Sequence, residues 1–115
     1  MSAAVAARPY CATEAQTLSA VMALLERHPK VAWRRRINSG AFKLDGERFF
    51  RAGFVGCSDI IGQLRGGKFL AVEVKSREGV ITEAQEAFLD AVRGAGGVAF
   101  VARSADDVMR NLATA

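Results

Sequence analysis

Apolar side chains near the start of the chain recur at the spacing of one helix face. They are Leu18, Val21, Met22 and Leu25. Thr13, followed three residues later by Gln16, is the pattern of a capping box. Because Pro29 cannot continue a helix, we expect a helix over residues 13–27.

The next segment favours strands. Residues 31–37 predict a strand that carries three consecutive arginines, and residues 38–40 predict a turn. Asp45-Gly46 is a strong hairpin signal, because this dipeptide suits a tight turn between two short apolar runs. The runs contain Phe42 and Leu44 before the turn and Phe49 and Phe50 after it. We expect this hairpin to begin a meander.

A second hairpin is predicted from residues 59–64 and 69–75, which are joined by Gly66-Gly67. The second of these runs is almost wholly apolar, as a central strand buried on both faces should be.

Helical and strand signals alternate in the remainder of the chain. Thr82 with Gln85 predicts a second capped helix, which ends at the glycines after residue 93. Residues 98–102 predict a short strand, and Ser104 starts a third helix. The order of elements predicts an α/β fold, with a central mixed sheet flanked by helices.

Length and composition set the broad class. A chain of 115 residues, half of them apolar, suits one domain over residues 1–115, with residues 1–11 expected to form a flexible N-terminal tail. No apolar run approaches the roughly 18 residues of a membrane span, and no secretory signal pattern is present. Cys11 and Cys57 are too far apart for a thiolate metal motif. We expect a cytoplasmic protein with no membrane partner.

Charge is distributed unevenly. Residues 27–68 carry ten cations and three acids, a balance of +7, whereas the rest of the chain carries six cations and nine acids. Twelve of the sixteen cations are arginine, whose planar fork matches phosphate oxygens. A polyanionic partner such as nucleic acid is one interpretation, and a solvated basic face without a partner is the other.

Asp59, Glu73 and Lys75 are the candidate chemical site. Glu73 and Lys75 lie two residues apart on one face of an otherwise apolar strand, where unpaired charges are costly. Folding at Gly66-Gly67 brings Asp59 onto the neighbouring strand. Two carboxylates and an ammonium form an oxygen-rich site that suits Mg²⁺. The plain alternative for Glu73 and Lys75 is a structural ion pair.

Two helix-borne residues have two interpretations each. Glu14 lies on the core-facing stripe of the first helix, yet a first-turn glutamate also complements the helix dipole. Gln85 lies on the apolar stripe of the second helix, yet it also occupies the capping-box position. Trp33 is expected in the core, and His28 is expected to contact the carbonyls at the end of the first helix.

The ordered motifs resemble the VRR-Nuc (virus-type replication-repair nuclease) domain of the PD-(D/E)xK nuclease superfamily. They are Glu14, Arg36-Ile37-Asn38-Ser39-Gly40, Gly56-Cys57-Ser58-Asp59-Ile60-Ile61, Glu73-Val74-Lys75-Ser76 and Thr82-x-x-Gln85-x-x-Phe88-Leu89. The resemblance covers about residues 12–103. Ser58 stands where the commonest form of the motif has proline, a residue that shapes the backbone and supplies no ligand.

The resemblance implies a restriction-endonuclease-like α/β sandwich and a metal-dependent DNA endonuclease that leaves a 5′-phosphate and a 3′-hydroxyl. Its metal ligands would be Asp59, Glu73 and the Val74 carbonyl, with Glu14 binding directly or through water. Mg²⁺ would be the cofactor, with Mn²⁺ as a substitute. Lys75 would assist the attacking water and stabilise charge on the phosphate. Gln85 would support the site from the second helix.

The resemblance also suggests partners. The basic block would hold DNA, and because alternate residues of a strand face together, we favour Arg34 and Arg36, with Asn38, Arg48 and Arg51 nearby. Stand-alone members are similar to small phage and bacterial enzymes that form homodimers and cut branched DNA, such as Holliday junctions, in DNA repair. Phe49, Phe50 and Phe54 would then be either dimer contacts or core residues.

Two other functions remain open at this point. One is a non-catalytic DNA-binding or DNA-end-binding module that keeps the nuclease fold. The other is an adaptor subunit whose basic face binds a protein. No phosphate-binding loop or dinucleotide fingerprint is present, so we expect no nucleotide cofactor.

Overall fold

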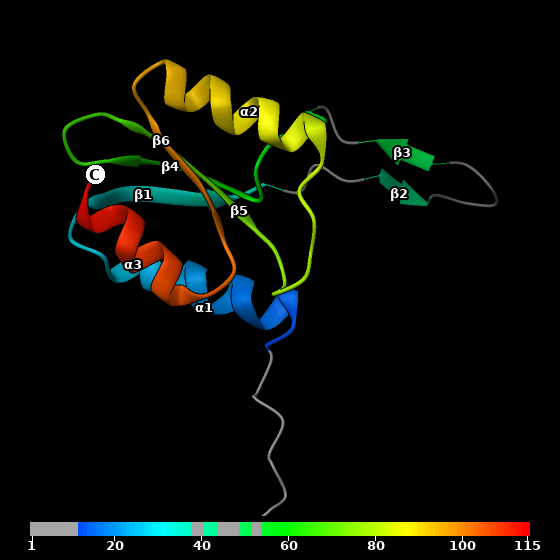
Figure 1. Ribbon diagram of the computed structural model, residues 1–115, viewed down its shortest axis with the longest axis horizontal. Coiled ribbons are helices and arrows are strands. Elements are labelled where there is room, and N and C mark those ends of the chain that lie inside the picture. Colours follow the sequence, from blue (N-terminus) through cyan, green and yellow to red (C-terminus); the bar gives the residue numbers. More distant parts are fainter. Residues whose placement is uncertain (1–11, 38–40, 44–48, 52–53) are drawn as a thin grey trace, which may run out of the picture.

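The computed structural model describes residues 12–37, 41–43, 49–51 and 54–115. It contains nine elements in chain order (Figure 1). They are α1 (Glu14–Arg27), β1 (Val31–Arg36), β2 (Ala41–Lys43), β3 (Phe49–Arg51), β4 (Ile60–Leu64), β5 (Phe69–Val74), α2 (Glu83–Gly94), β6 (Val98–Ala102) and α3 (Ala105–Ala113). The predicted tail, residues 1–11, lies outside the described residues.

Each helix begins at the residue that the sequence marks as its cap. Thr13 and Thr82 each accept a hydrogen bond from the backbone N–H three residues later, at 3.1 Å, and the glutamine at that position bonds back to the cap. Ser104 caps α3 in the same way through the Asp107 N–H. Both predicted capping boxes are therefore confirmed.

The main sheet has four strands in the order β1-β4-β5-β6. β4 pairs antiparallel with β1 and with β5, whereas β5 pairs parallel with β6, so the sheet is mixed as predicted. β5 is a central strand, and every residue of it except Phe69 is buried.

The Asp45-Gly46 hairpin does not start a meander. β2 and β3 pair antiparallel, as expected, but they form a two-stranded sheet of their own, which lies apart from the main sheet in Figure 1. Because β1 pairs directly with β4, the hairpin between them in sequence is not inserted between these two strands.

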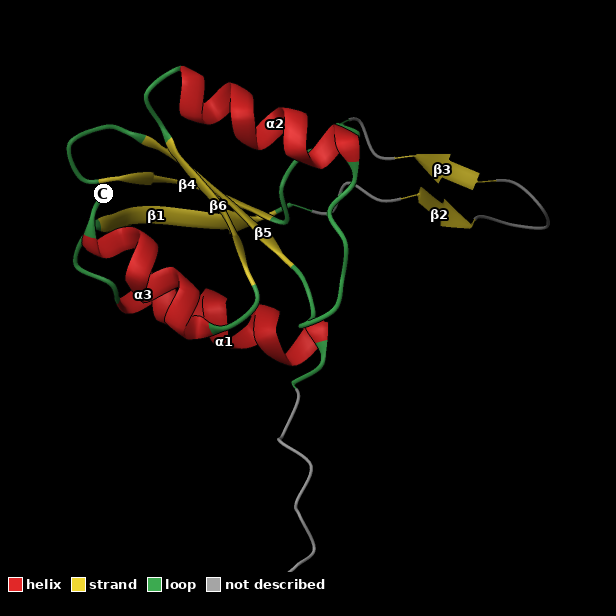
Figure 2. Cartoon of the chain, viewed as in Figure 1, coloured by secondary structure: helices red, strands yellow, loops and turns green. Residues whose placement is uncertain are grey.

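Helices cover both faces of the main sheet (Figure 2). α1 and α3 pack on one face over the larger core, which includes Leu25, Ile60, Leu70, Val72 and Leu112. α2 packs on the other face, against β5 and β6, over a smaller core. None of the helices in the described ranges is long and apolar enough to cross a membrane.

Two aromatic residues that the sequence analysis considered as core residues are exposed. Trp33 is 43% exposed, because it projects on the α2 side of β1, whereas α2 packs mainly on β5 and β6. Phe54 is 52% exposed and packs edge-on against Phe88, with ring centroids 5.1 Å apart. The side chains of Phe49 and Phe50 are outside the described part of the structure.

Candidate active site

Asp59 directly precedes β4 and Glu73 lies near the end of β5, and continuing the β4–β5 register places the two residues opposite each other. They are linked by two reciprocal hydrogen bonds. The Asp59 N–H donates to Glu73 Oε1 at 3.1 Å, and the Val74 N–H donates to Asp59 Oδ2 at 2.8 Å. The predicted hairpin thus brings both carboxylates together in a fixed orientation.

Lys75 completes this cluster. Its Nζ lies 3.7 Å from Glu73 Oε2, and its backbone N–H donates to the Ala102 carbonyl on β6. Glu73 is 1% exposed, so its charge has almost no hydration of its own. Burying a carboxylate is tolerable when such partners replace water. Every buried side-chain nitrogen and oxygen among the described residues has a hydrogen-bond partner.

The electrostatics of the cluster favour an added positive charge. Burial is the main reason that the pKa of Glu73 rises from its ordinary value to about 7, and the neighbouring charge of Asp59 raises it further. The Lys75 ammonium lowers this pKa but does not offset the other two effects. A cation bound between the carboxylates would relieve both burial and repulsion.

The loop before Asp59 is shaped by two residues. Gly56 has a φ of +88°, and a Cβ there would lie 2.7 Å from the Ala84 carbonyl oxygen in the first turn of α2. Ser58 is 1% exposed, and its hydroxyl donates to the Ile60 carbonyl at 2.8 Å. Ser58 therefore holds the bend by a hydrogen bond at the position where the family motif commonly has proline.

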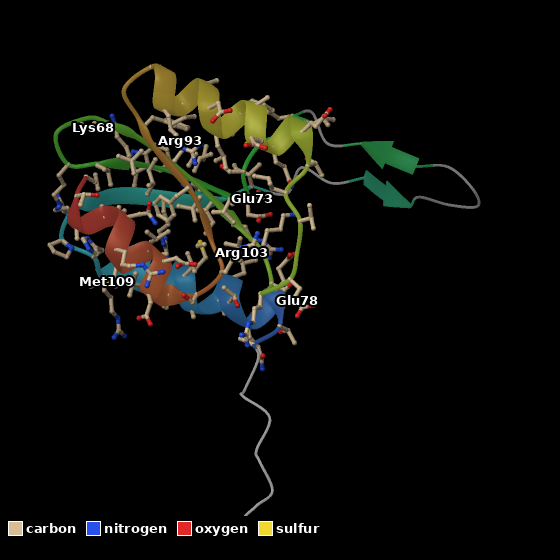
Figure 3. All side chains as sticks on the ribbon, viewed as in Figure 1. Lys68, Glu73, Glu78, Arg93, Arg103 and Met109 are labelled. Atoms are coloured by element: carbon tan, nitrogen blue, oxygen red, sulfur yellow. The ribbon has the colours of Figure 1, made fainter. Side chains whose placement is uncertain are left out.

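Arg103 is a site-supporting residue that sequence reasoning missed. It follows β6, and its Nη1 donates to the carbonyls of Ser76, Arg77 and Gly79 at 2.8, 3.3 and 2.6 Å. Figure 3 shows Arg103 beside this loop, which directly follows Lys75. Because the partners are 24 to 27 positions apart in the chain, no sequence spacing could have indicated the contact.

The remaining predicted ligands occupy different positions. Val74 lies between Glu73 and Lys75, and its peptide group is beside Asp59 through the 2.8 Å hydrogen bond. The Glu14 side chain is exposed in the first turn of α1 and makes no hydrogen bond or ion pair with a described residue. Gln85 serves the capping box, in which its Oε1 accepts from the Thr82 N–H at 3.0 Å. Metal binding by Glu14 and catalysis by Gln85 stay predictions.

Two of the predicted DNA-binding arginines, Arg34 and Arg36, lie on the opposite side of the sheet from the carboxylates. Arg34 and Arg36 do face together, as expected, but they pair with Gly62 and Ile60 on the α1 side of the sheet. Arg34 contacts α1 there, through Glu26 at 3.3 Å and the Met22 carbonyl at 3.4 Å. The structure therefore does not bring Arg34 to the Asp59 cluster. Asn38, Arg48 and the Arg51 side chain lie outside the described residues.

Two further residues have structural roles. His28 is the C-cap of α1, but its Nδ1 accepts from the Lys30 N–H at 3.1 Å instead of contacting terminal carbonyls. Cys57 is buried, and this burial together with the charge of Glu73 raises the pKa of its thiol. A raised pKa disfavours the thiolate, so Cys57 is no candidate nucleophile.

The donor set fits a hard divalent cation. Mg²⁺ binds through one or two carboxylates and keeps several waters, and Asp59 and Glu73 supply two. In the described part of the chain no group of three or more His, Cys, Asp or Glu side chains gathers around a common point. Water, a backbone carbonyl such as that of Val74, and phosphate oxygens would supply the other coordination positions.

Fold and site together define a class of protein. Three helices flank an open, four-stranded mixed sheet, and an aspartate meets a Glu-x-Lys pair on two neighbouring strands. This is a restriction-endonuclease-like α/β fold. The VRR-NUC domain family matches residues 6–106, and the chain belongs to that family. It is a nuclease-type DNA-processing module whose partner is DNA. Neither a curated protein nor a solved structure matches the chain.

Proposed function

We propose that this protein is an Mg²⁺-dependent endonuclease that hydrolyses phosphodiester bonds in branched or otherwise structured DNA during replication, recombination or repair. The observation that carries the proposal is the Asp59–Glu73–Lys75 cluster. Two carboxylates and one ammonium meet on neighbouring strands, and one carboxylate is 1% exposed. Membership of a nuclease family supports the same conclusion.

The proposed reaction is hydrolysis of the bond between phosphorus and the 3′-oxygen. Water attacks the phosphorus, its oxygen stays on the 5′-phosphate, and the departing 3′-oxygen takes a proton to become a hydroxyl. A divalent cation held by Asp59 and Glu73 supplies Lewis acidity toward the phosphoryl oxygen, and Mn²⁺ should replace Mg²⁺.

Lys75 has two roles in this proposal. Its ammonium places positive charge beside the phosphate, where negative charge grows in the transition state. It also orients the attacking water or helps to remove its proton. The Lys75 side chain is 16% exposed, so it borders solvent while its stem is held at the end of β5.

The proposal includes a homodimer, because a domain of this size, matched over residues 6–106, has little surface with which to hold a branched substrate. An apolar surface is available for the contact. Phe54, Val55 and Val80 are 52%, 54% and 81% exposed. They lie around the start of α2, to which Phe54 is joined by its contact with Phe88. Exposed apolar groups gathered in this way are typical of interaction surfaces.

The experiment compares four-way junction, flap, nicked and linear DNA side by side, with Mg²⁺, Mn²⁺ or EDTA. We expect cleavage of the branched substrates with either metal and none with EDTA. Cleavage in EDTA would contradict the metal role of the carboxylates. DNA binding without cleavage under every metal condition would instead support a non-catalytic DNA-binding module.

A further inference from the structure

One face of the main sheet is only half covered. α2 packs mainly on β5 and β6, and among the described elements no helix packs closely on the same side of β1 and β4. We call this area the open face and define it by four residues of these strands, which are Trp33, Arg35, Ile61 and Gln63. Trp33 is 43% exposed, and Phe69, which pairs with Gln63 from β5, is 38% exposed.

The open face is continuous with the active site. Side chains alternate along a strand, and directly opposed residues of an antiparallel pair point to the same side. Arg35 is opposite Ile61, and Trp33 is opposite Gln63. Ile61 and Gln63 follow Asp59 at intervals of two residues, so they share its side of the sheet. Trp33 and Arg35 therefore face the same side as Asp59 and Glu73.

Arg35 differs from its neighbour Arg34 in what it contacts. The Arg34 guanidinium is occupied by Glu26 and by the Met22 carbonyl on α1. The Arg35 side chain is exposed and makes no hydrogen bond or ion pair with any residue of the described ranges. Of the four residues that define the open face, Arg35 alone is charged, so the face suits an anion.

Trp33 is held in place although it is exposed. Its indole N–H donates to Gln63 Oε1 at 3.0 Å, and Gln63 Nε2 donates to the Gly67 carbonyl at 3.2 Å. These two bonds fix an aromatic ring at the surface before any ligand arrives. A fixed ring is suited to stacking on bases, which contributes about 1–3 kcal/mol per base in single-strand binding.

We propose that the open face binds the DNA strand that leaves the active site, with Arg35 on a backbone phosphate and Trp33 stacked on a base or sugar. Arg35 lies two residues, about 7 Å, along β1 from the position opposite Asp59. Because each strand of a duplex has one phosphate per about 3.4 Å of axis, this contact falls about two nucleotides from the cleaved bond. The inference rests on the proposed function.

The chain provides its own probe, because Trp33 is its single tryptophan. The experiment excites tryptophan selectively in the Lys75→Ala protein, with Mg²⁺ present, while labelled junction DNA is added and its anisotropy is followed. We expect emission to be quenched, and protection from iodide to rise, in parallel with binding. Binding at saturation that leaves both the emission and the iodide accessibility unchanged would overturn the inference.

A second experiment tests Arg35 by its charge. In a plot of log DNA affinity against log salt concentration, the magnitude of the slope decreases by about 0.7–0.9 for each phosphate contact that is lost. We expect this decrease in Arg35→Gln and not in the matched control Arg27→Gln, which removes the same charge from the end of α1. A decrease in Arg36→Gln with none in Arg35→Gln would place DNA on the opposite side of the sheet and overturn the inference.

The two proposals fail in different ways. Suppose that wild-type protein cleaves DNA, but Trp33 emission does not change on binding and Arg35→Gln has an unchanged salt dependence. The open-face proposal is then wrong and the nuclease proposal stands. If the protein neither binds nor cleaves DNA, both are wrong.

Discussion

Asp59 and Glu73 hold each other in position across the β4–β5 pair. Glu73 accepts a hydrogen bond from the Asp59 N–H, and Asp59 accepts one from the N–H of Val74, the residue after Glu73. Each carboxylate is thus oriented by the backbone of the opposite strand. Each of these bonds can therefore be tested separately for its effect on stability and on chemistry.

Replacing Asp59 should separate its contribution to stability from its contribution to cleavage. Asp59→Asn keeps an oxygen for the Val74 N–H but loses the charge, so we expect near-normal stability and a loss of cleavage of about 10²-fold or more. Asp59→Ala also leaves the Val74 N–H unpaired, and should cost about 1–3 kcal/mol in the free energy of unfolding. Urea denaturation and single-turnover cleavage measure the two effects, with Asp106→Asn as the control. Full activity in Asp59→Asn would exclude Asp59 as a ligand.

The stability of the metal-free protein should depend on pH through Glu73. Its pKa is about 7 in the folded protein against an ordinary value of 4.5, so the folded state binds the proton more tightly. The associated stability is fully present below about pH 4.5 and is lost as the pH rises through about 7. The loss amounts to roughly 3 kcal/mol at most.

Urea denaturation across this range, with Glu73→Gln as reference, measures that dependence. We expect the wild type to lose stability relative to Glu73→Gln as the pH rises. Mg²⁺ should raise the melting temperature more at about pH 8 than at about pH 5, because the cation binds the ionised form. A Mg²⁺ effect that is the same at both pH values would contradict binding at Glu73.

Most of the fold could be predicted because its signals are local. The Thr13 and Thr82 capping boxes and the Gly66-Gly67 turn depend on residues within a few positions of each other, and the structure confirms all three. The pairing of Asp59 with Glu73 followed from the turn between them. Such features need no knowledge of distant contacts.

The features that were missed depend on long-range pairing. The separate β2–β3 sheet and the exposure of Trp33 both follow from which strand β1 pairs with and where α2 packs. Strand alternation correctly grouped Arg34 with Arg36, but it cannot say which group faces Asp59. The contacts of Arg103 with residues 76–79 arise only when β6 lies beside β5.

Gly56 should not tolerate a side chain. Gly56→Ala would place a Cβ 2.7 Å from the Ala84 carbonyl oxygen, at a φ of +88° that side chains disfavour. We expect a loss of about 1–3 kcal/mol and reduced cleavage, since the loop leads directly to Asp59. Gly66→Ala is the comparison: its φ of +101° is also positive, but no atom lies within 4 Å of the added Cβ. Equal losses in both variants would show that the approach to Ala84 has no effect.

Arg103 should act as a positioning residue for Lys75. Arg103→Gln removes the guanidinium that binds three carbonyls of residues 76–79, so we expect kcat to fall about 10- to 100-fold while KM stays within about twofold. Arg110→Gln, on α3, is the control of equal charge. Kinetics and thermal melting should be measured together. A loss of activity explained entirely by a lower melting temperature would assign Arg103 a purely structural role.

The apolar surface formed by Phe54, Val55 and Val80 should mediate dimerisation. Val80→Ser changes the most exposed of the three, at 81%, and should leave the fold intact while it shifts sedimentation toward the monomer. Met109→Ser, on α3, is the control, since Met109 is also exposed, at 47%. A wild-type protein that sediments as a monomer at micromolar concentration would contradict the proposed dimer.

Cleavage of a four-way junction by wild type, Glu73→Gln and Glu86→Gln tests the central claim most directly. Both substitutions remove one carboxylate charge, but Glu86 is exposed in the first turn of α2, whereas Glu73 is buried beside Asp59 and Lys75. With Mg²⁺ we predict that wild type and Glu86→Gln cut at similar rates, that Glu73→Gln is at least about 10²-fold slower, and that EDTA abolishes all cleavage. Undiminished cleavage by Glu73→Gln would contradict the claim that this cluster is the catalytic centre.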